Sequence, residues 1–139
     1  MSETLHFSCV AIGGRGVLIG GASGAGKSDL ALRLIDRGAM LVSDDYTTLT
    51  ACDGTLIASA PPNIAGRIEV RGIGIVSLPY LAEAPAALLV TLDDVPERLP
   101  MPAVRPIAGL DIREVAVDAR SASAPIKVEL ALAGLVEEP

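Results

Sequence analysis

The sequence has 139 residues, a length that suits one folded domain with a single hydrophobic core. Hydrophobic residues make up 50% of it and aromatic residues only 2%, so the core must be built from aliphatic side chains. A net charge of −6 with no run of Lys or Arg argues against a nucleic-acid partner, and no apolar stretch is long enough to suggest a membrane span.

The first predicted elements are two strands that lead into a glycine-rich loop. Residues 5–12 have the alternation of a strand, in which His6 and Ser8 point away from the apolar face. A turn follows, and residues 17–19 form a second, buried strand that can pair with the first as a hairpin. This hairpin runs directly into the segment Gly21-Ala22-Ser23-Gly24-Ala25-Gly26-Lys27-Ser28.

This segment matches the phosphate-binding pattern G-x-x-x-x-G-K-[ST], and it stands between a strand and a helix, as the pattern requires. Its glycines allow backbone amides to turn inward around phosphate oxygens, and the dipole of the following helix favours negative charge. Lys27 would neutralise the outer phosphates, and the Ser28 hydroxyl would ligate Mg²⁺. The segment therefore predicts a protein that grips the phosphates of a nucleotide.

An acidic pair follows the helix that we predict over residues 27–37. Gly38 stands where this helix should end, and residues 40–42 form a short buried strand that runs into Asp44-Asp45. In a parallel sheet this strand end lies beside the phosphate loop, where one carboxylate would organise Mg²⁺ and the other would accept a proton from an attacking hydroxyl. Because aspartate is common at strand ends, a solvated turn is the alternative interpretation.

Two further segments follow the acidic pair. Residues 47–59 are typical of a hairpin, with an Asp-Gly pair suited to its tight turn. Residues 67–76 begin with alternating charged and apolar side chains, so that Glu69 and Arg71 share one face of a strand. A face of this kind, followed by two glycines, suits a ligand, but the residues alone leave its role open.

A second acidic pair, Asp93-Asp94, ends the buried strand predicted over residues 86–92 and is a rival site for a metal ion. The prolines that follow favour a surface loop instead, which we expect to extend over residues 95–106 and to carry Arg98. The remaining predicted elements are a strand over residues 114–118 and a helix over residues 125–133.

The two cysteines, Cys9 and Cys52, are too few for a disulfide framework. The N-terminus lacks the positive start and apolar run of a secretory signal. We therefore expect two reduced, largely buried thiols in a cytoplasmic protein with an α/β fold.

Three blocks of the sequence together resemble one family, the bacterial HPr kinase/phosphorylases. The first block is the phosphate loop with the helix behind it, residues 21–35, and the second is the Arg-Gly that leads to the Asp-Asp pair, residues 37–45. The third block resembles the family signature of a strand with Glu, Arg and Gly-x-Gly, here Ile68-Glu69-Val70-Arg71-Gly72-Ile73-Gly74-Ile75. A phosphate loop alone is generic, but these blocks in this order are specific.

The resemblance implies a P-loop kinase domain of the phosphoenolpyruvate-carboxykinase type, with a mixed β-sheet and flanking helices. It implies an enzyme that uses ATP and Mg²⁺ to phosphorylate a serine of the phosphocarrier protein HPr, and many members also remove this phosphate by phosphorolysis. It further implies a homo-oligomer, since the family forms hexamers. Longer members carry an additional N-terminal domain, whereas we expect residues 1–139 to be a single catalytic domain.

The resemblance also implies catalytic roles for individual residues. His6 takes the position of an active-site histidine, and Asp45 takes that of the catalytic base, which acts as the acid in the reverse reaction. Lys27 matches the phosphate contact, and Arg71 belongs to the catalytic segment of the third block. Arg98 resembles the family's catalytic arginine, which would stabilise charge on the transferred group.

Three residues are implied on the metal side of the site. Ser28 and Glu69 match Mg²⁺ ligand positions, and Asp44 is the metal-side partner within the acidic pair.

The sequence leaves two other functions open, a small-molecule P-loop kinase or NTPase and a non-catalytic nucleotide sensor. Labelled ATP offered together with purified HPr would separate all three.

Overall fold

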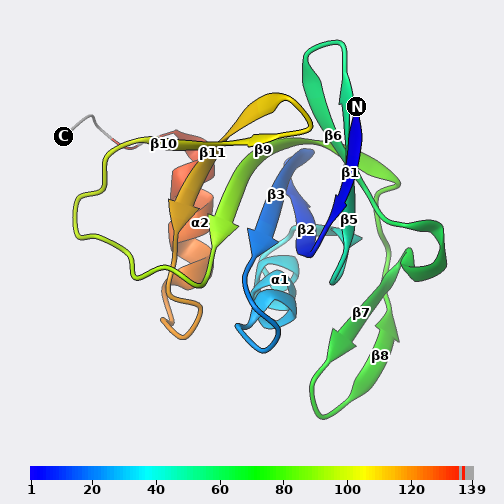
Figure 1. Cartoon of the computed structure of the whole chain (residues 1–139). Helices are drawn as coiled ribbons and strands as arrows, with labels where there is room; N and C mark the ends of the chain where they lie inside the picture. The colour runs from blue at the N-terminus through cyan, green and yellow to red at the C-terminus, as the bar shows by residue number, and fades with distance from the viewer. Residues whose placement is uncertain (135, 137–139) are drawn as a thin grey trace.

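The computed structural model describes residues 1–134 and residue 136. In this part of the chain nine strands form one mixed sheet, two helices cover one of its faces, and a two-stranded hairpin projects from it (Figure 1). No helix among these residues is long and apolar enough to cross a membrane. The elements are β1 (Ser2–Leu5), β2 (Phe7–Ile12), β3 (Arg15–Gly20), α1 (Lys27–Asp36), β4 (Met40–Ser43), β5 (Thr47–Cys52), β6 (Thr55–Ser59), the 3₁₀ helix η1 (Pro62–Ile64), β7 (Arg67–Val70), β8 (Gly74–Ser77), β9 (Glu83–Thr91), β10 (Ala103–Ile107), β11 (Leu110–Ala116) and α2 (Ala124–Ala133).

The centre of the sheet determines where the phosphate loop lies. Strand β3 pairs with β2 in antiparallel and with β9 in parallel orientation, and β9 pairs in parallel with β11. The carboxyl ends of β3, β9 and β11 therefore share one edge of the sheet. Strand β4 reaches the same edge although β2 lies between it and β3, because β2 is antiparallel to both. Strand β4 thus runs in the same direction as β3 without being its neighbour, and Asp44 and Asp45 follow it at the edge of the sheet that carries the phosphate loop, as expected.

Successive side chains of β3 point to opposite faces of the sheet and contribute to a hydrophobic core on each face. Val17 and Ile19 pack with both helices, on the same side as Leu30 of α1 and Val128 of α2. Leu18 points to the opposite face, into a second cluster made by the strands alone. Since both faces of β3 are buried, its sequence is continuously apolar rather than alternating. The phosphate loop therefore extends from a strand that is buried on both faces.

The sheet branches at β9, and the last strands of two of its arms, β1 and β10, approach each other. The turn between β10 and β11 lies close to β1, where the backbone N–H of Ala108 donates to the Glu3 carboxylate over 2.6 Å. Among residues 1–134 and 136, strand β10 pairs only with β11, and it tolerates Pro106 at its free edge. Residues 103–106, which we expected to belong to a loop, are therefore strand, and β11 begins at Leu110 rather than at 114.

Two other expected strands are interrupted. The strand predicted over residues 5–12 bends at His6, because β1 pairs with β5 whereas β2 pairs with β3 and β4. The segment 67–76 is a hairpin rather than one strand, since Gly72 and Gly74 have positive φ angles of 83° and 121°. Arg71 consequently lies in the turn and does not share a strand face with Glu69.

Several predicted elements are confirmed. They are the hairpin over residues 47–59, the buried strand over residues 86–92 and both helices, with shifts of one to three residues at their ends. Cys9 is buried as expected, whereas Cys52 is exposed at the end of β5.

Candidate active site

The phosphate loop connects the end of β3 to the first residue of α1. Gly24 and Gly26 adopt left-handed φ angles of 83° and 103°, which residues with a side chain rarely adopt. Lys27 is buried, and its ammonium group donates to the carbonyl oxygens of Gly21 at 2.7 Å and Ala22 at 3.1 Å. The loop thus combines a fixed cation with the amide-lined N-terminus of a helix, an arrangement that suits phosphate.

Asp44 joins three segments of the site. Its Oδ1 atom accepts hydrogen bonds from the hydroxyl groups of Ser28, at 2.6 Å, and Ser8, at 3.0 Å. Its Oδ2 atom accepts from the backbone N–H of Glu69 at 3.0 Å. A buried carboxylate with three donors is well satisfied, so Asp44 holds the start of α1, β2 and β7 in one place.

Asp45 has a different environment from its neighbour. Its side chain is 59% exposed, and Oδ1 lies 2.7 Å from Nε2 of His6. Its φ of 69° lies in the left-handed region that Asp tolerates better than most residues, and its N–H donates to the Ser8 hydroxyl. The His6 ring in turn stacks on Tyr46, with ring centroids 5.1 Å apart. Asp45 is therefore the oriented and accessible carboxylate of the pair.

One cavity of about 420 Å³ brings most of the predicted site together. It lies along the phosphate loop and the start of α1, and the β7–β8 hairpin closes one side. The predicted residues that line it are His6, Ser23, Gly24, Gly26, Lys27, Ser28, Asp45, Glu69 and Arg71. The phosphate loop and Asp45 therefore line the same cavity.

A magnesium ion fits this donor set only together with phosphate. The described residues contain no group of three Asp, Glu, His or Cys side chains placed to hold a metal ion alone. The Ser28 hydroxyl and the Asp44 carboxylate are in contact, and Glu69 contacts Asp44 through its backbone N–H. Since Mg²⁺ keeps several waters and is bound through one or two carboxylates plus substrate phosphates, Ser28, Asp44 and Glu69 could hold it beside a nucleotide.

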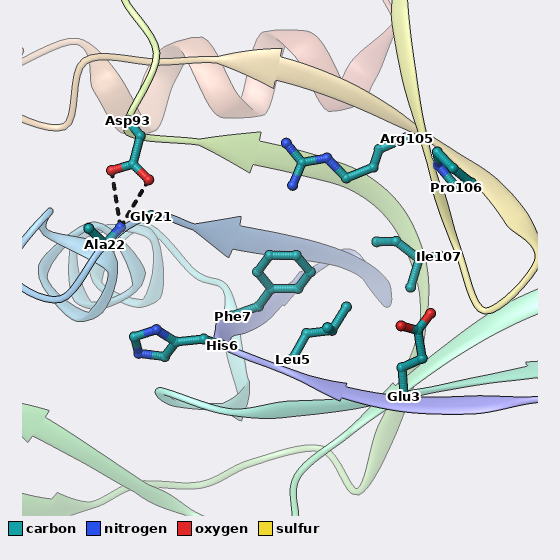
Figure 2. A pocket seen from close by; sticks show the side chains of 10 residues that line it. All are labelled: Glu3, Leu5, His6, Phe7, Gly21, Ala22, Asp93, Arg105, Pro106 and Ile107. Atoms are coloured by element: carbon teal, nitrogen blue, oxygen red, sulfur yellow. Dashed lines mark hydrogen bonds between the residues drawn. The ribbon is translucent and has the colours of Figure 1, made fainter.

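A second cavity, of about 530 Å³, opens on the other side of His6 (Figure 2). It lies between β1 and β10, at the mouth of the curled sheet, with Phe7 and Ile107 in its wall. Arg105 also lines it, and the guanidinium group is held by Glu114 through bonds of 3.0 and 2.7 Å. His6 borders both cavities.

Comparisons with known proteins agree with this geometry. The family model described as HPr serine kinase C-terminal domain matches residues 1–82. The chain belongs to this family. In the solved structures, the Hpr(Ser) kinase/phosphatase from Coxiella burnetii matches it with a TM-score of 0.82 and 27% identity, covering 96% of this chain and 90% of that one. The fold is therefore that of the P-loop kinase domain in this family.

Curated relatives match about half of the chain. The HPr kinase/phosphorylase of Clostridium botulinum (strain Eklund 17B / Type B) is 49% identical over 77 residues, and that of Clostridium tetani is 48% identical over 77 residues. Each match covers 55% of this chain and 25% of the relative. The match thus spans about a quarter of the length of these HPr kinase/phosphorylases.

Two arginines lie differently from what the sequence indicated. Arg98 is exposed in the segment between β9 and β10 and lines neither cavity, so the structure does not bring it to the site. Its catalytic role stays a prediction. Arg105 instead reaches the neighbourhood of the phosphate loop, because pairing with β11 carries β10 back over the sheet edge.

The sequence analysis named Asp93 as part of a rival metal site but did not predict its contact with the phosphate loop. We expected a surface loop, yet both carboxylate oxygens of Asp93 accept from the backbone N–H of Ala22 at 3.0 Å (Figure 2). The order of the strands could have indicated this contact. Asp93 follows the end of β9, and because β9 is parallel to β3, its end lies at the edge of the sheet that carries the phosphate loop. Ser8 was also missed, although it links Asp44 and Asp45 through its hydroxyl.

Proposed function

We propose that this domain transfers the γ-phosphoryl group of ATP, in the presence of Mg²⁺, to a serine hydroxyl of the phosphocarrier protein HPr. The observation that carries the proposal is the split between two neighbouring carboxylates. Asp44 is buried and bonded to the hydroxyl of Ser28, whereas Asp45 is exposed, is paired with His6 and lines the cavity that Ser28 also lines. One site thus offers separate groups for holding phosphate and for activating an acceptor.

The phosphate side of the reaction rests on the loop. Its amides and the Lys27 ammonium group bind the outer phosphates and hold them in line for attack. When bound at Ser28, Asp44 and Glu69, Mg²⁺ would neutralise charge that develops on the phosphate oxygens. Arg71 lies at the same cavity, where its guanidinium group supplies a further positive charge.

The acceptor side rests on Asp45. A serine hydroxyl is a weak nucleophile, so its proton must leave as the bond to phosphorus forms. Asp45 is exposed enough to reach that hydroxyl, and His6 fixes the carboxylate through its ring nitrogen. In the reverse direction Asp45 would return the proton to the serine oxygen while inorganic phosphate attacks phosphoserine.

The decisive experiment offers labelled ATP, Mg²⁺ and purified HPr to the protein and maps the modified residue. We expect one phosphate on a serine of HPr, and we expect Asp45→Asn to abolish transfer while ATP still binds. Asp53→Asn is the matched control, because Asp53 also has a positive φ, of 50°, but lies in the distant β5–β6 turn.

Three results would count against the proposal. Full transfer by Asp45→Asn would remove the assigned base. Nucleotide turnover that a metabolite stimulates while HPr stays unmodified would favour a small-molecule kinase or NTPase. Tight ATP binding with no turnover by the unmodified protein would favour a nucleotide sensor.

A further inference from the structure

The end of strand β9 is in direct contact with the first residues of the phosphate loop. Hydrogen bonding to β3 continues one residue beyond the end of β9, since the N–H of Leu92 donates to the carbonyl oxygen of Gly20 at 2.9 Å. The contact is close, because a Cβ atom on Gly21 would lie 3.2 Å from the Cβ of Leu92 and 3.5 Å from an oxygen of Asp93. Asp93 is therefore placed against the loop by the sheet itself.

The peptide group between Gly21 and Ala22 is held from both of its ends. Its N–H, on Ala22, faces the two oxygens of the Asp93 carboxylate, each 3.0 Å away (Figure 2). Its carbonyl oxygen, on Gly21, accepts from the Lys27 ammonium group at 2.7 Å. A negative charge at the N–H and a positive charge at the C=O favour the same orientation of the peptide dipole, so the two bonds reinforce each other.

We infer that Asp93 is a positioning residue that fixes the orientation of this peptide group and, through it, the ammonium group of Lys27. With the N–H turned toward Asp93, the carbonyl oxygen faces into the loop and holds the Lys27 cation near the phosphates. Without Asp93 the peptide group can rotate, and Lys27 loses its shortest contact. The inference rests on the proposed function, because phosphoryl transfer is the step that Lys27 serves.

The consequence falls on the transfer step more than on nucleotide affinity. Binding of ATP is shared by several loop amides, the metal side of the site and Lys27, so one displaced contact changes it little. Transfer depends on the exact place of the cation as charge shifts between the phosphates. Removing the Asp93 carboxylate also removes a negative charge beside the phosphate loop, which offsets part of any loss of affinity.

The test compares three variants in the full chain. We expect Asp93→Ala to lower kcat about tenfold or more, while the Kd for MgATP changes by less than about threefold. Asp93→Asn retains an acceptor oxygen without the charge and should lie between Asp93→Ala and the unmodified protein. Asp94→Ala is the matched control, since Asp94 is exposed and lines neither cavity; we expect it to leave kcat unchanged.

A readout that needs no activity accompanies the kinetics. By NMR, hydrogen exchange of the Ala22 amide should accelerate about tenfold in Asp93→Ala and stay unchanged in Asp94→Ala, and the Lys27 Nζ signal should shift only in Asp93→Ala.

The inference is overturned if Asp93→Ala keeps the kcat of Asp94→Ala, if its Kd for MgATP rises as much as kcat/KM falls, or if neither NMR signal responds. If the unmodified protein transfers no phosphate to HPr, the proposed function fails, and the two NMR signals decide the role of Asp93 alone.

Discussion

His6, at the bend between β1 and β2, is paired with Asp45, which follows β4, and its Nε2 atom lies 2.7 Å from Oδ1 of Asp45. The bend is what makes the pair possible, because it takes His6 out of the ladder of either strand and turns its ring toward the end of β4. Asp45 in turn needs a left-handed φ of 69° to present its carboxylate. Two local departures from regular structure thus meet at the group that we propose as the base.

Replacing His6 tests whether this pair matters for transfer. His6→Phe keeps an aromatic ring to stack on Tyr46 but removes the hydrogen bond to Asp45, so we expect kcat to fall about 10- to 100-fold with little change in ATP affinity. Steady-state kinetics and nucleotide titration measure both quantities. Tyr46→Phe keeps the stack and is the control. Wild-type rates in His6→Phe would show that Asp45 needs no partner.

The two cysteines should differ sharply in reactivity. Burial raises the pKa of Cys9 to about 12, whereas Cys52 is exposed, and only the thiolate reacts with a disulfide reagent. At pH 8 we therefore expect one reactive thiol in the folded chain, two in denaturant and none in folded Cys52→Ser.

The raised pKa of Cys9 also predicts a loss of stability in alkali. The unfolded chain releases the Cys9 proton near the ordinary thiol pKa of 9.0, whereas the folded chain retains it to about 12. The free energy of unfolding should therefore fall as the pH rises through this interval. Urea unfolding of Cys9→Ala should show less of this dependence than the unmodified protein. An identical slope in both would contradict the assignment to Cys9.

Asp44 should matter for stability as well as for the metal. Its carboxylate accepts from Ser8, Ser28 and the backbone of Glu69, and an Asn in its place has one acceptor oxygen in place of two. We expect Asp44→Asn to lower the free energy of unfolding by about 1–3 kcal/mol, measured in urea. Asp45→Asn is the comparison, because the Asp45 side chain is exposed and its replacement should lower the free energy of unfolding by less. Equal effects at the two positions would mean that the bonds at Asp44 contribute little.

Structure that is determined by consecutive residues could be predicted from the sequence, whereas contacts between residues far apart in the chain could not. The loop around Lys27 is specified by consecutive residues, so its structure and the helix behind it were predictable. The contact of Asp93 with Ala22 joins residues 71 positions apart and follows only from the pairing of β9 with β3. Arg71 was assigned to a strand because alternation was read past Val70, whereas the glycines behind it turn the chain.

The position of Arg105, like that of Asp93, follows from strand pairing that the local sequence does not reveal. Nothing near residue 105 indicates that β10 folds back on β11, and the pairing of β11 with β9 is what brings the strand to the site. The neighbouring positions 96, 100, 102 and 106 are prolines, which favoured a loop over this whole segment. A single edge strand with one partner tolerates Pro106, so composition was a poor guide there.

Two glycines of the phosphate loop should respond differently to alanine. Gly24 and Gly26 both have left-handed φ angles, so each substitution should strain the backbone by about 1–2 kcal/mol. A Cβ atom on Gly26 would in addition lie 3.2 Å from the Cβ of Ala119, whereas one on Gly24 would have nothing within 4 Å. We therefore expect Gly26→Ala to be the less stable variant, by about 1 kcal/mol or more in urea unfolding. Ala119→Gly should recover part of that difference in Gly26→Ala and none of the loss in Gly24→Ala. If both glycine variants unfold alike, strain alone governs the loop and its packing against residue 119 contributes nothing.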